Sequence, residues 1–282
     1  MKYKKLIGII AIMLSIFALA VFLSSEKTMN AFSGCPKELY KIQNNHVYSL
    51  SQIIPDADPK TFTILSGRSE FDQCSGYAQD GKHIYYFYDA LPVFADIKSF
   101  SVLERFFAKD SSHVYFGGVP IDDADVATFS LLKDPKGEGT LYSKDKSHVY
   151  VSSPQSRETK VVENADPSSF MILVSLTVPC LPEKHDCNNG NFPFGIVLAK
   201  DENSVFGAFG DVISEADSTT FEVLKDPADE FSIYSKDNKH IYAGNLNINT
   251  KILLADYSTF NVLSQTEAQD KNHTYFEGEI VK

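Results

Sequence analysis

Histidine and aspartate are the residue types in this sequence best suited to chemistry, and they recur together at a fixed spacing. The pattern is Asp-x-x-His, then Val, Ile or Thr, then Tyr or Phe, with copies at Asp80–His83, Asp110–His113, Asp145–His148, Asp237–His240 and Asp270–His273. Such a row could ligate a metal, titrate as a pH-sensitive patch, or form the His/Asp face of a metal-dependent hydrolase. The competing interpretation makes each His a partly buried strand residue whose ring bonds the turn. A copy at Asp201–Ser204 lacks the His, which favours the structural interpretation.

A second pattern alternates with the first and reads Ala-Asp-x-x-(Ser/Thr)-Phe, followed by a short apolar run. Its aspartates and phenylalanines are Asp58 and Phe62, Asp96 and Phe100, Asp125 and Phe129, Asp166 and Phe170, Asp217 and Phe221, and Asp256 and Phe260. Further acidic residues nearby, such as Asp56 and Asp122, suggest calcium binding as an alternative role. No Asp-x-Asp-x-Asp-Gly loop with a distal Glu occurs, so an EF-hand is excluded. Capping and turn formation account for these aspartates without a metal.

Each pattern predicts a local structure. In segments such as Leu141–Tyr150, apolar residues flank a polar tetrad, which predicts a β-hairpin whose Asp side chain bonds amides of the turn. The Ala-Asp pattern predicts one capped helical turn, because Asp is a favoured cap residue and Ala can pack against the Phe five residues later. The Phe then begins a short alternating strand.

The two patterns together define a tandem repeat. With a worn copy at Gln43–His46 included, the hairpin copies begin at Gln43, Asp80, Asp110, Asp145, Asp201, Asp237 and Asp270. The longest interval, from Asp145 to Asp201, indicates an insertion at residues 174–196. One such unit cannot bury its aromatic face alone, so neighbours must stack on it. We predict an all-β fold of repeats of about 35 residues, each with short strands, a β-hairpin and one capped helical turn, in an open solenoid-like stack. The alternative is a β-propeller.

The N-terminal segment has the pattern of an export signal. Residues 2–5 are Lys-Tyr-Lys-Lys, and an apolar run extends from Leu6 to Leu23. As a helix this run spans roughly 27 Å, close to the ~30 Å hydrocarbon core of a bilayer. Residues 1–27 are therefore predicted to form an apolar helix that is either an uncleaved signal anchor or a signal peptide, cut after Ala20 or at the weaker site Leu23-Ser24-Ser25. A lipoprotein site at Cys35 fits less well, because a polar stretch separates it from the apolar run.

All four cysteines, Cys35, Cys74, Cys180 and Cys187, follow this segment. An even number in an exported chain predicts two disulfides, and neighbours in sequence favour Cys35–Cys74 and Cys180–Cys187 among the three possible pairings. A zinc site of Cys180, His185 and Cys187 lacks a fourth ligand at a recognisable spacing.

Charge and missing motifs narrow the function. The net charge is −11, and −14 without Lys2, Lys4 and Lys5, so the chain repels phosphate backbones and no nucleic-acid partner is expected. No Gly-x-Ser-x-Gly, His-Glu-x-x-His, phosphate loop or Gly-x-Gly-x-x-Gly occurs. We therefore expect no catalytic residue, no metal and no cofactor.

Two sequence segments resemble a known family. Lys144–Tyr150 (Lys-Asp-Lys-Ser-His-Val-Tyr) and Gln269–Phe276 (Gln-Asp-Lys-Asn-His-Thr-Tyr-Phe), alternating with Ala-Asp-Pro-Ser-Ser-Phe, resemble the DKNYY repeat family. The resemblance covers about residues 40–282, although only Tyr85-Tyr86 keeps the paired tyrosines. It implies an exported bacterial repeat protein of uncharacterised function, and it brings no catalytic residues.

The expected organisation is a signal segment at 1–27, a linker at 28–39 and the repeat array at 40–282. The expected function is a non-enzymatic scaffold or binding module of the bacterial cell envelope, held in the cytoplasmic membrane by the N-terminal segment with the repeats outside the cytoplasm. Cleavage of that segment would instead give a secreted or periplasmic protein. A protein, peptide or glycan is the expected ligand.

Overall fold

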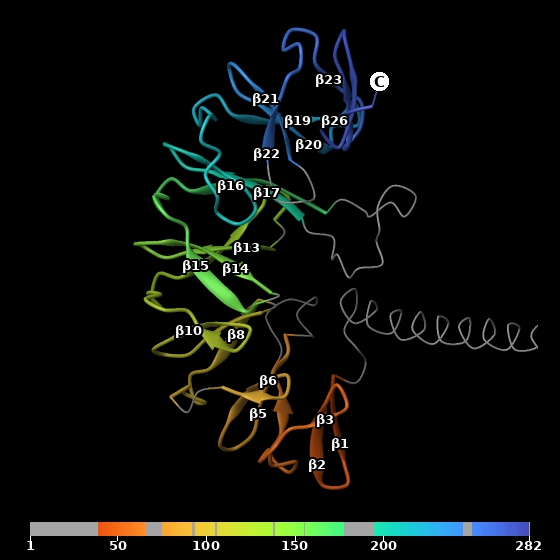
Figure 1. Cartoon of the computed structure of the whole chain (residues 1–282). Helices are drawn as coiled ribbons and strands as arrows, with labels where there is room; N and C mark the ends of the chain where they lie inside the picture. Colours follow the sequence, from red (N-terminus) through yellow and green to blue (C-terminus); the bar gives the residue numbers. More distant parts are fainter. Residues whose placement is uncertain are drawn as a thin grey trace, which may run out of the picture. The chain divides into compact units, whose positions relative to one another are not determined.

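The computed structural model describes residues 39–65, 75–91, 94–104, 106–137, 139–154, 156–177, 195–244 and 250–281 (Figure 1). Within these ranges the chain consists of strands and turns and has no helix, which confirms the all-β prediction. The strands form seven small antiparallel sheets, none of which closes on itself. The chain divides into two compact units, Met1–Leu91 and Pro92–Lys282, and the division falls inside the predicted array.

The described residues of the first unit form two sheets. A three-stranded sheet has the order β1-β2-β3, with β1 Tyr40–Gln43, β2 His46–Ser49 and β3 Gln52–Ile53. A four-stranded sheet follows in the order β4-β5-β6-β7, with β4 Thr63–Ile64, β5 Tyr77–Gln79, β6 Ile84–Tyr86 and β7 Asp89–Ala90.

The described residues of the second unit form five sheets that follow one another in chain order (Figure 1). The first two hold β8 Ser101–Glu104, β9 Phe107–Lys109, β10 Val114–Phe116 and β11 Val119–Pro120, then β12 Ser130–Lys133, β13 Gly139–Lys144, β14 Val149–Ser153 and β15 Glu158–Val161. The third holds β16 Met171–Thr177, β17 Gly195–Lys200 and β18 Val205–Phe206. The last two hold β19 Glu222–Lys225, β20 Phe231–Lys236, β21 Ile241–Gly244 and β22 Thr250–Leu253, then β23 Asn261–Val262, β24 Glu267–Gln269, β25 Thr274–Phe276 and β26 Glu279–Ile280.

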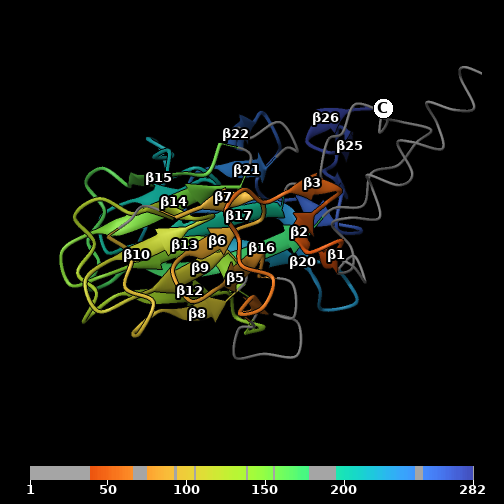
Figure 2. The same ribbon diagram turned by 90° about the horizontal axis from the view of Figure 1, so that it is seen from below.

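One four-stranded sheet corresponds to one repeat. The Ala-Asp turn precedes the first strand, and the Asp-x-x-His hairpin joins the second and third strands, as in β12–β15, whose strands lie side by side in chain order in Figure 2. The short strand predicted after the turn and the two strands of the predicted hairpin are present, and a further short strand follows the hairpin and precedes the next turn, as β15 does. Several of these fourth strands, such as β11 at Val119–Pro120, are only two residues long.

The Ala-Asp segments form single turns, and none continues into a helix in the described ranges. In two of them the Phe amide donates to the Asp carbonyl four residues back, from Phe129 to Asp125 and from Phe170 to Asp166. The capped helical turn of the prediction is thus one isolated turn, because the strand begins immediately after the Phe.

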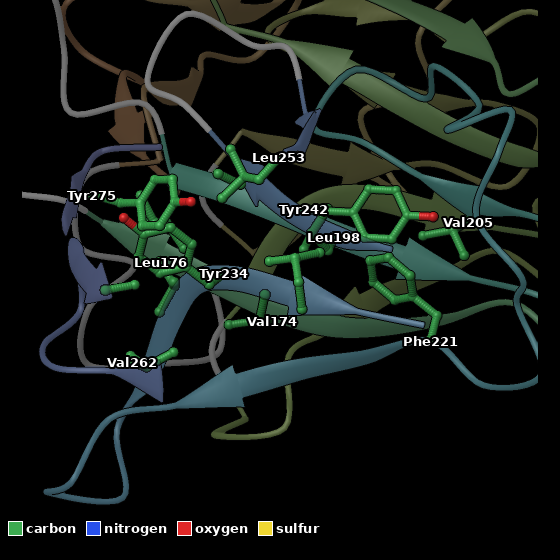
Figure 3. Close-up of a cluster of buried hydrophobic side chains, with 14 residues drawn as sticks. Val174, Leu176, Leu198, Val205, Phe221, Tyr234, Tyr242, Leu253, Val262 and Tyr275 are labelled. Atoms are coloured by element: carbon green, nitrogen blue, oxygen red, sulfur yellow. The ribbon is translucent and has the colours of Figure 1, made fainter. Parts of the chain in front are cut away.

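Neighbouring sheets share their buried side chains. In the second unit one cluster joins the sheets β16–β18, β19–β22 and β23–β26 through Leu198, Tyr234, Tyr242, Leu253 and Tyr275 (Figure 3). A second cluster joins β12–β15 to β16–β18, and a third joins β8–β11 to β12–β15. In the first unit Ile54 after β3 packs with Ala78 and Tyr85 of the next sheet. The aromatic residues of the repeats therefore form the contacts between successive sheets.

Several predicted features lie outside the described residues. They are the N-terminal apolar segment, the proposed linker up to residue 38, His185, and all four cysteines with both predicted disulfides. The predicted insertion 174–196 is part strand: β16 runs to Thr177 and β17 begins at Gly195, so the two strands pair across a connection of residues 178–194. In the described part of the chain, no helix is long and apolar enough to cross a membrane.

Candidate functional site: the repeated aspartate–tyrosine–histidine cluster

The hairpin aspartate closes its own turn. In each copy its Oδ1 accepts hydrogen bonds from the backbone N–H groups two and three residues later, at 2.7–2.8 Å. Five of these carboxylates are buried, and Asp270 is half-buried; the six are Asp80, Asp110, Asp145, Asp201, Asp237 and Asp270. A buried carboxylate requires such bonds because an unpaired one is costly to remove from water.

The second oxygen of the same carboxylate holds the preceding Ala-Asp turn. Oδ2 accepts the backbone N–H of the turn aspartate at 2.7–3.1 Å, in the pairs Asp58–Asp80, Asp96–Asp110, Asp125–Asp145, Asp166–Asp201, Asp217–Asp237 and Asp256–Asp270. The residues of a pair are 14 to 35 positions apart in sequence. One carboxylate therefore ties together the two motifs of its repeat.

A buried tyrosine supplies the fourth donor. The Oη five residues after the hairpin Asp donates to Oδ2 at 2.7–2.9 Å in Tyr85, Tyr115, Tyr150, Tyr242 and Tyr275. These tyrosines are at most 1% exposed. In the Asp201 copy the equivalent residue is Phe206, so this carboxylate has three donors rather than four.

Burial and hydrogen bonding act in opposite directions on these carboxyls. Burial by itself would raise the pKa of Asp80, but the N–H groups of Asp58, Lys82 and His83 and the Tyr85 hydroxyl outweigh it and hold this pKa at about 2. The same balance gives a pKa of about 2 for Asp237 and Asp270 and lowers the pKa of Asp110 and Asp145. Burial, and then the bond to the carboxylate, raise the pKa of Tyr275 to about 12. The ordinary state is thus an ionised Asp and a neutral Tyr.

The histidine lies beside the tyrosine rather than against the turn backbone. In four copies Nδ1 is 3.3–3.5 Å from the Tyr Oη, in His83, His148, His240 and His273. Because that hydroxyl gives its proton to the carboxylate, it is placed to accept from Nδ1–H, which leaves Nε2 as the acceptor nitrogen. His113 differs, since its Nδ1 has no hydrogen-bond partner and its ring lies 4.7 Å from that of Phe94.

Two copies that depart from the pattern separate the roles of these residues. Where Phe206 replaces the tyrosine, Ser204 replaces the histidine. Where Gln43 replaces the aspartate, the ring of His46 turns to the carbonyl of Asn44, with Nδ1 2.8 Å from the oxygen. The histidine therefore occurs in the copies that have the tyrosine, and in four of them its Nδ1 lies beside the Asp-bound hydroxyl.

A return bond completes the link between turn and hairpin. The Ser or Thr hydroxyl three residues after the turn Asp accepts the backbone N–H that follows the hairpin Asp, at 2.9–3.2 Å, from Thr61, Ser99, Thr128, Ser169, Thr220 and Thr259. The turn Asp carboxylate meanwhile bonds its own turn, as Asp166 does with the N–H of Ser168 at 2.9 Å. Each motif therefore satisfies polar groups of the other.

The phenylalanine of the turn lies against the aromatic residue of the hairpin. Ring centroids are 5.2–6.2 Å apart in the pairs Phe62–Tyr85, Phe100–Tyr115, Phe129–Tyr150, Phe170–Phe206, Phe221–Tyr242 and Phe260–Tyr275. The structure thus brings together, within each repeat, the Asp, His and Phe residues that the sequence singled out. The role of the tyrosine and of the Ser/Thr hydroxyl was missed, although both positions are visible in the repeated patterns.

The hydrogen bonds leave these carboxylates little capacity for other chemistry. An ionised carboxylate offers about four lone-pair sites, and in five copies four protein donors occupy them. Within the described ranges, no three His, Cys, Asp or Glu side chains are grouped so as to hold a metal ion. The arrangement can hold a turn against a hairpin, and in the five copies with four donors the carboxylate has no lone-pair site left for a ligand.

Comparison with known proteins supports the family resemblance. The DKNYY family model matches residues 25–154, which confirms the resemblance over that part of the chain. No curated protein matches the sequence. No solved structure matches it either.

Proposed function

We propose that this chain, whose residues 25–154 belong to the DKNYY family, is a non-enzymatic repeat protein of the bacterial cell envelope that acts as a scaffold or binding module. The observation that supports this most is the use of the repeated Asp, Tyr and His side chains within each repeat. Residues that recur because they join a turn to a hairpin are not available as a catalytic set. A metal-dependent hydrolase would need carboxylate lone pairs that these hydrogen bonds already occupy.

The proposed location follows from the N-terminal sequence. Lysines precede the apolar run Leu6–Leu23, so the segment is proposed to anchor the chain in the cytoplasmic membrane with the repeats outside. Cleavage would release the same repeats to the periplasm or the medium. Protease treatment of intact and lysed spheroplasts distinguishes these locations from a cytoplasmic one, in which the repeats would be digested only after lysis.

We further propose that the array is an open stack rather than a propeller. The position three residues before the hairpin Asp is a buried apolar or aromatic residue in the four sheets before β23–β26, namely Phe107, Tyr142, Leu198 and Tyr234. In the β23–β26 sheet the same position is the exposed Glu267. At the end of the fourth strand or directly after it, Ile121, Val162 and Leu253 are at most 8% exposed, and the equivalent Val281 is 60% exposed. Closure into a ring would bury Glu267 and Val281 against another sheet, at a high cost for the charge.

Two measurements test these proposals. Affinity capture of the full chain from an envelope fraction, with chemical cross-linking, should yield a specific protein, peptide or glycan partner; a consistently empty capture argues against a binding role. Neutron scattering of the full chain in contrast-matched detergent should give a radius of gyration above the roughly 19 Å expected for a compact domain of this length. A radius of gyration no larger than that of the compact domain would favour the propeller.

A further inference from the structure

Exposed aliphatic residues recur at one position on the edges of neighbouring sheets in the second unit. The position pairs with the buried aromatic residue five places after the hairpin Asp, on the side of the sheet where the chain leaves the hairpin. Three successive sheets carry Val161 opposite Tyr150, Val212 opposite Phe206, and Ile252 opposite Tyr242. The first two aliphatic side chains are 46% exposed and the third is 36% exposed. Exposed sheet edges more often carry charged residues or Pro, so a repeated apolar residue here is typical of a surface that a partner covers.

The three aliphatic residues, Val161, Val212 and Ile252, lie along one side of the second unit and are called the aliphatic stripe below. Figure 2 shows β15 and β22 along one side of this unit and β8 and β12 along the opposite side. Neighbouring sheets share buried side chains, and packed sheets lie about 10 Å apart. The stripe therefore places one aliphatic side chain about every 10 Å along that side.

Charged side chains lie between the members of the aliphatic stripe. Val161 shares a face of its sheet with the tyrosine that it pairs with, which packs with the preceding sheet. Lys160 is on the other face, where its own pairing partner packs with the following sheet. Val212 likewise shares a face with an aromatic residue that packs with the preceding sheet, so Asp211 is directed toward the following one. Both charged residues are exposed, and the order along the stripe is Val161, Lys160, Val212, Asp211 and Ile252.

This order is complementary to itself when it is reversed. We propose that two copies of the chain pair through the aliphatic stripe, in opposite directions, about a two-fold axis at Val212. Val212 then lies against Val212 of the second copy. Lys160 faces Asp211 of the second copy, and Val161 faces its Ile252. Each of the last two contacts occurs twice, because a two-fold interface uses the same patch on both copies. Two stripes that ran in the same direction would set Lys160 against Lys160, which is unfavourable.

A second copy is the occupant that matches the spacing of the stripe. An extended strand repeats side chains on one face about every 6.6 Å, and a helix repeats every turn of about 5.4 Å. A second copy has the same period of about 10 Å as the stripe at every position. The net charge of −11 makes two copies repel each other at long range, and the facing Lys160 and Asp211 give the interface local attraction. The pairing uses only the packing within the second unit, and it is independent of the ligand that a binding role requires.

Sedimentation velocity of the full chain, in detergent matched in density to the solvent, tests the pairing. The native chain should form a dimer that dissociates on dilution. Val212→Asp sets two carboxylates against each other at the axis and should raise the dissociation constant by at least about 10-fold. Met171→Asp is the matched control, because Met171 is 50% exposed but lies on the first strand of its sheet, β16. This control should leave the dimer unchanged.

Charge reversal and cross-linking test the order of the contacts. Lys160→Asp and Asp211→Lys should each weaken the dimer by about 2- to 30-fold, and the double variant should restore it, because the pair re-forms with its signs exchanged. A carbodiimide joins an amine to a carboxylate that touches it. In a mixture of ¹⁵N-labelled and unlabelled chains it should therefore give a mixed-isotope cross-link between Lys160 and Asp211.

Three results would overturn the inference. The first is a chain that stays monomeric at the highest soluble concentration while the amides of the Asp201 hairpin remain protected from exchange. The second is a dimer that persists in Val212→Asp and gives no mixed-isotope cross-link, because such a dimer associates through another surface. The third is a double charge variant that dimerises no better than either single variant.

Discussion

Replacing the hairpin aspartate by asparagine should destabilise its repeat far more than the small change in shape suggests. In Asp145→Asn the remaining oxygen can still accept the N–H groups of Ser147 and His148, now 2.7 Å from Oδ1. The new NH₂ group faces the N–H of Asp125, which lies 2.9 Å from Oδ2 in the native chain, so two donors meet. The Tyr150 hydroxyl, 2.8 Å away, can reverse and accept.

The cost follows from these four contacts. One N–H without an acceptor costs about 1–3 kcal/mol, and two bonds that lose the assistance of a charge weaken by about 1 kcal/mol each, so the expected total is about 3–5 kcal/mol. Asp145 is 5% exposed, so water has little access to compensate. Because about 1.4 kcal/mol is a factor of ten, the Asp125 amide should exchange roughly 10²- to 10⁴-fold faster if it exchanges through opening of this repeat.

Hydrogen exchange measured by mass spectrometry is the appropriate assay, because a repeat array opens locally and one global midpoint does not describe it. Asp122→Asn is the matched control: it removes the same charge from an exposed carboxylate and should change stability by less than about 0.5 kcal/mol. A loss of under about 1 kcal/mol in Asp145→Asn, or exchange indistinguishable from the control, would refute the linking role of the carboxylate.

Three further outcomes are expected from the same geometry. Tyr150→Phe should cost about 1.5–3 kcal/mol of stability, because it removes one donor to a charged group. Phe206→Tyr should stabilise its repeat by about 1 kcal/mol through a new hydrogen bond to Asp201. Local hydrogen exchange measures both effects, and a destabilising Phe206→Tyr would show that the site has no room for the hydroxyl. The pKa of Asp80 and of Asp237 is about 2, below the usual 3.8. The stability that this difference contributes is present above pH 3.8 and is lost as the pH falls through about 2. The near-ultraviolet circular dichroism signal should therefore be constant from pH 7 to 5 and decline between about pH 4 and 2. A decline already complete at pH 5 contradicts this assignment. Tyr142→Phe removes bonds that its hydroxyl makes to the carbonyl of Gly207 and from the N–H of Gly210, and it should raise exchange at that N–H while leaving the Asp237 hairpin unchanged.

The local structure of the repeat was predictable because its signals are local. The hairpin Asp binds amides only two and three residues away, and the Ala-Asp turn lies directly before its Phe. Both structures therefore depend on short spacings that recur from copy to copy. The link between turn and hairpin was not predictable in this way. The two aspartates that it joins are 14 residues apart in one repeat and 35 in another, because the connection between the first two strands varies in length. The distance between the atoms stays at 2.7–3.1 Å, and only the folded chain displays that constancy.

Comparing the seven copies within this one sequence nevertheless tests the link between turn and hairpin. The sequence has seven hairpin copies and six Ala-Asp turns, and the hairpin with no such turn before it is the copy that has Gln43 in place of the aspartate. The Asp201 copy has lost both His and Tyr but is preceded by a turn, and it keeps its aspartate. The aspartate thus accompanies the turn, and the histidine accompanies the tyrosine. Residues whose presence is explained by a partner inside the repeat carry no information about a ligand. The search for function should therefore concentrate on positions where one copy departs from the others.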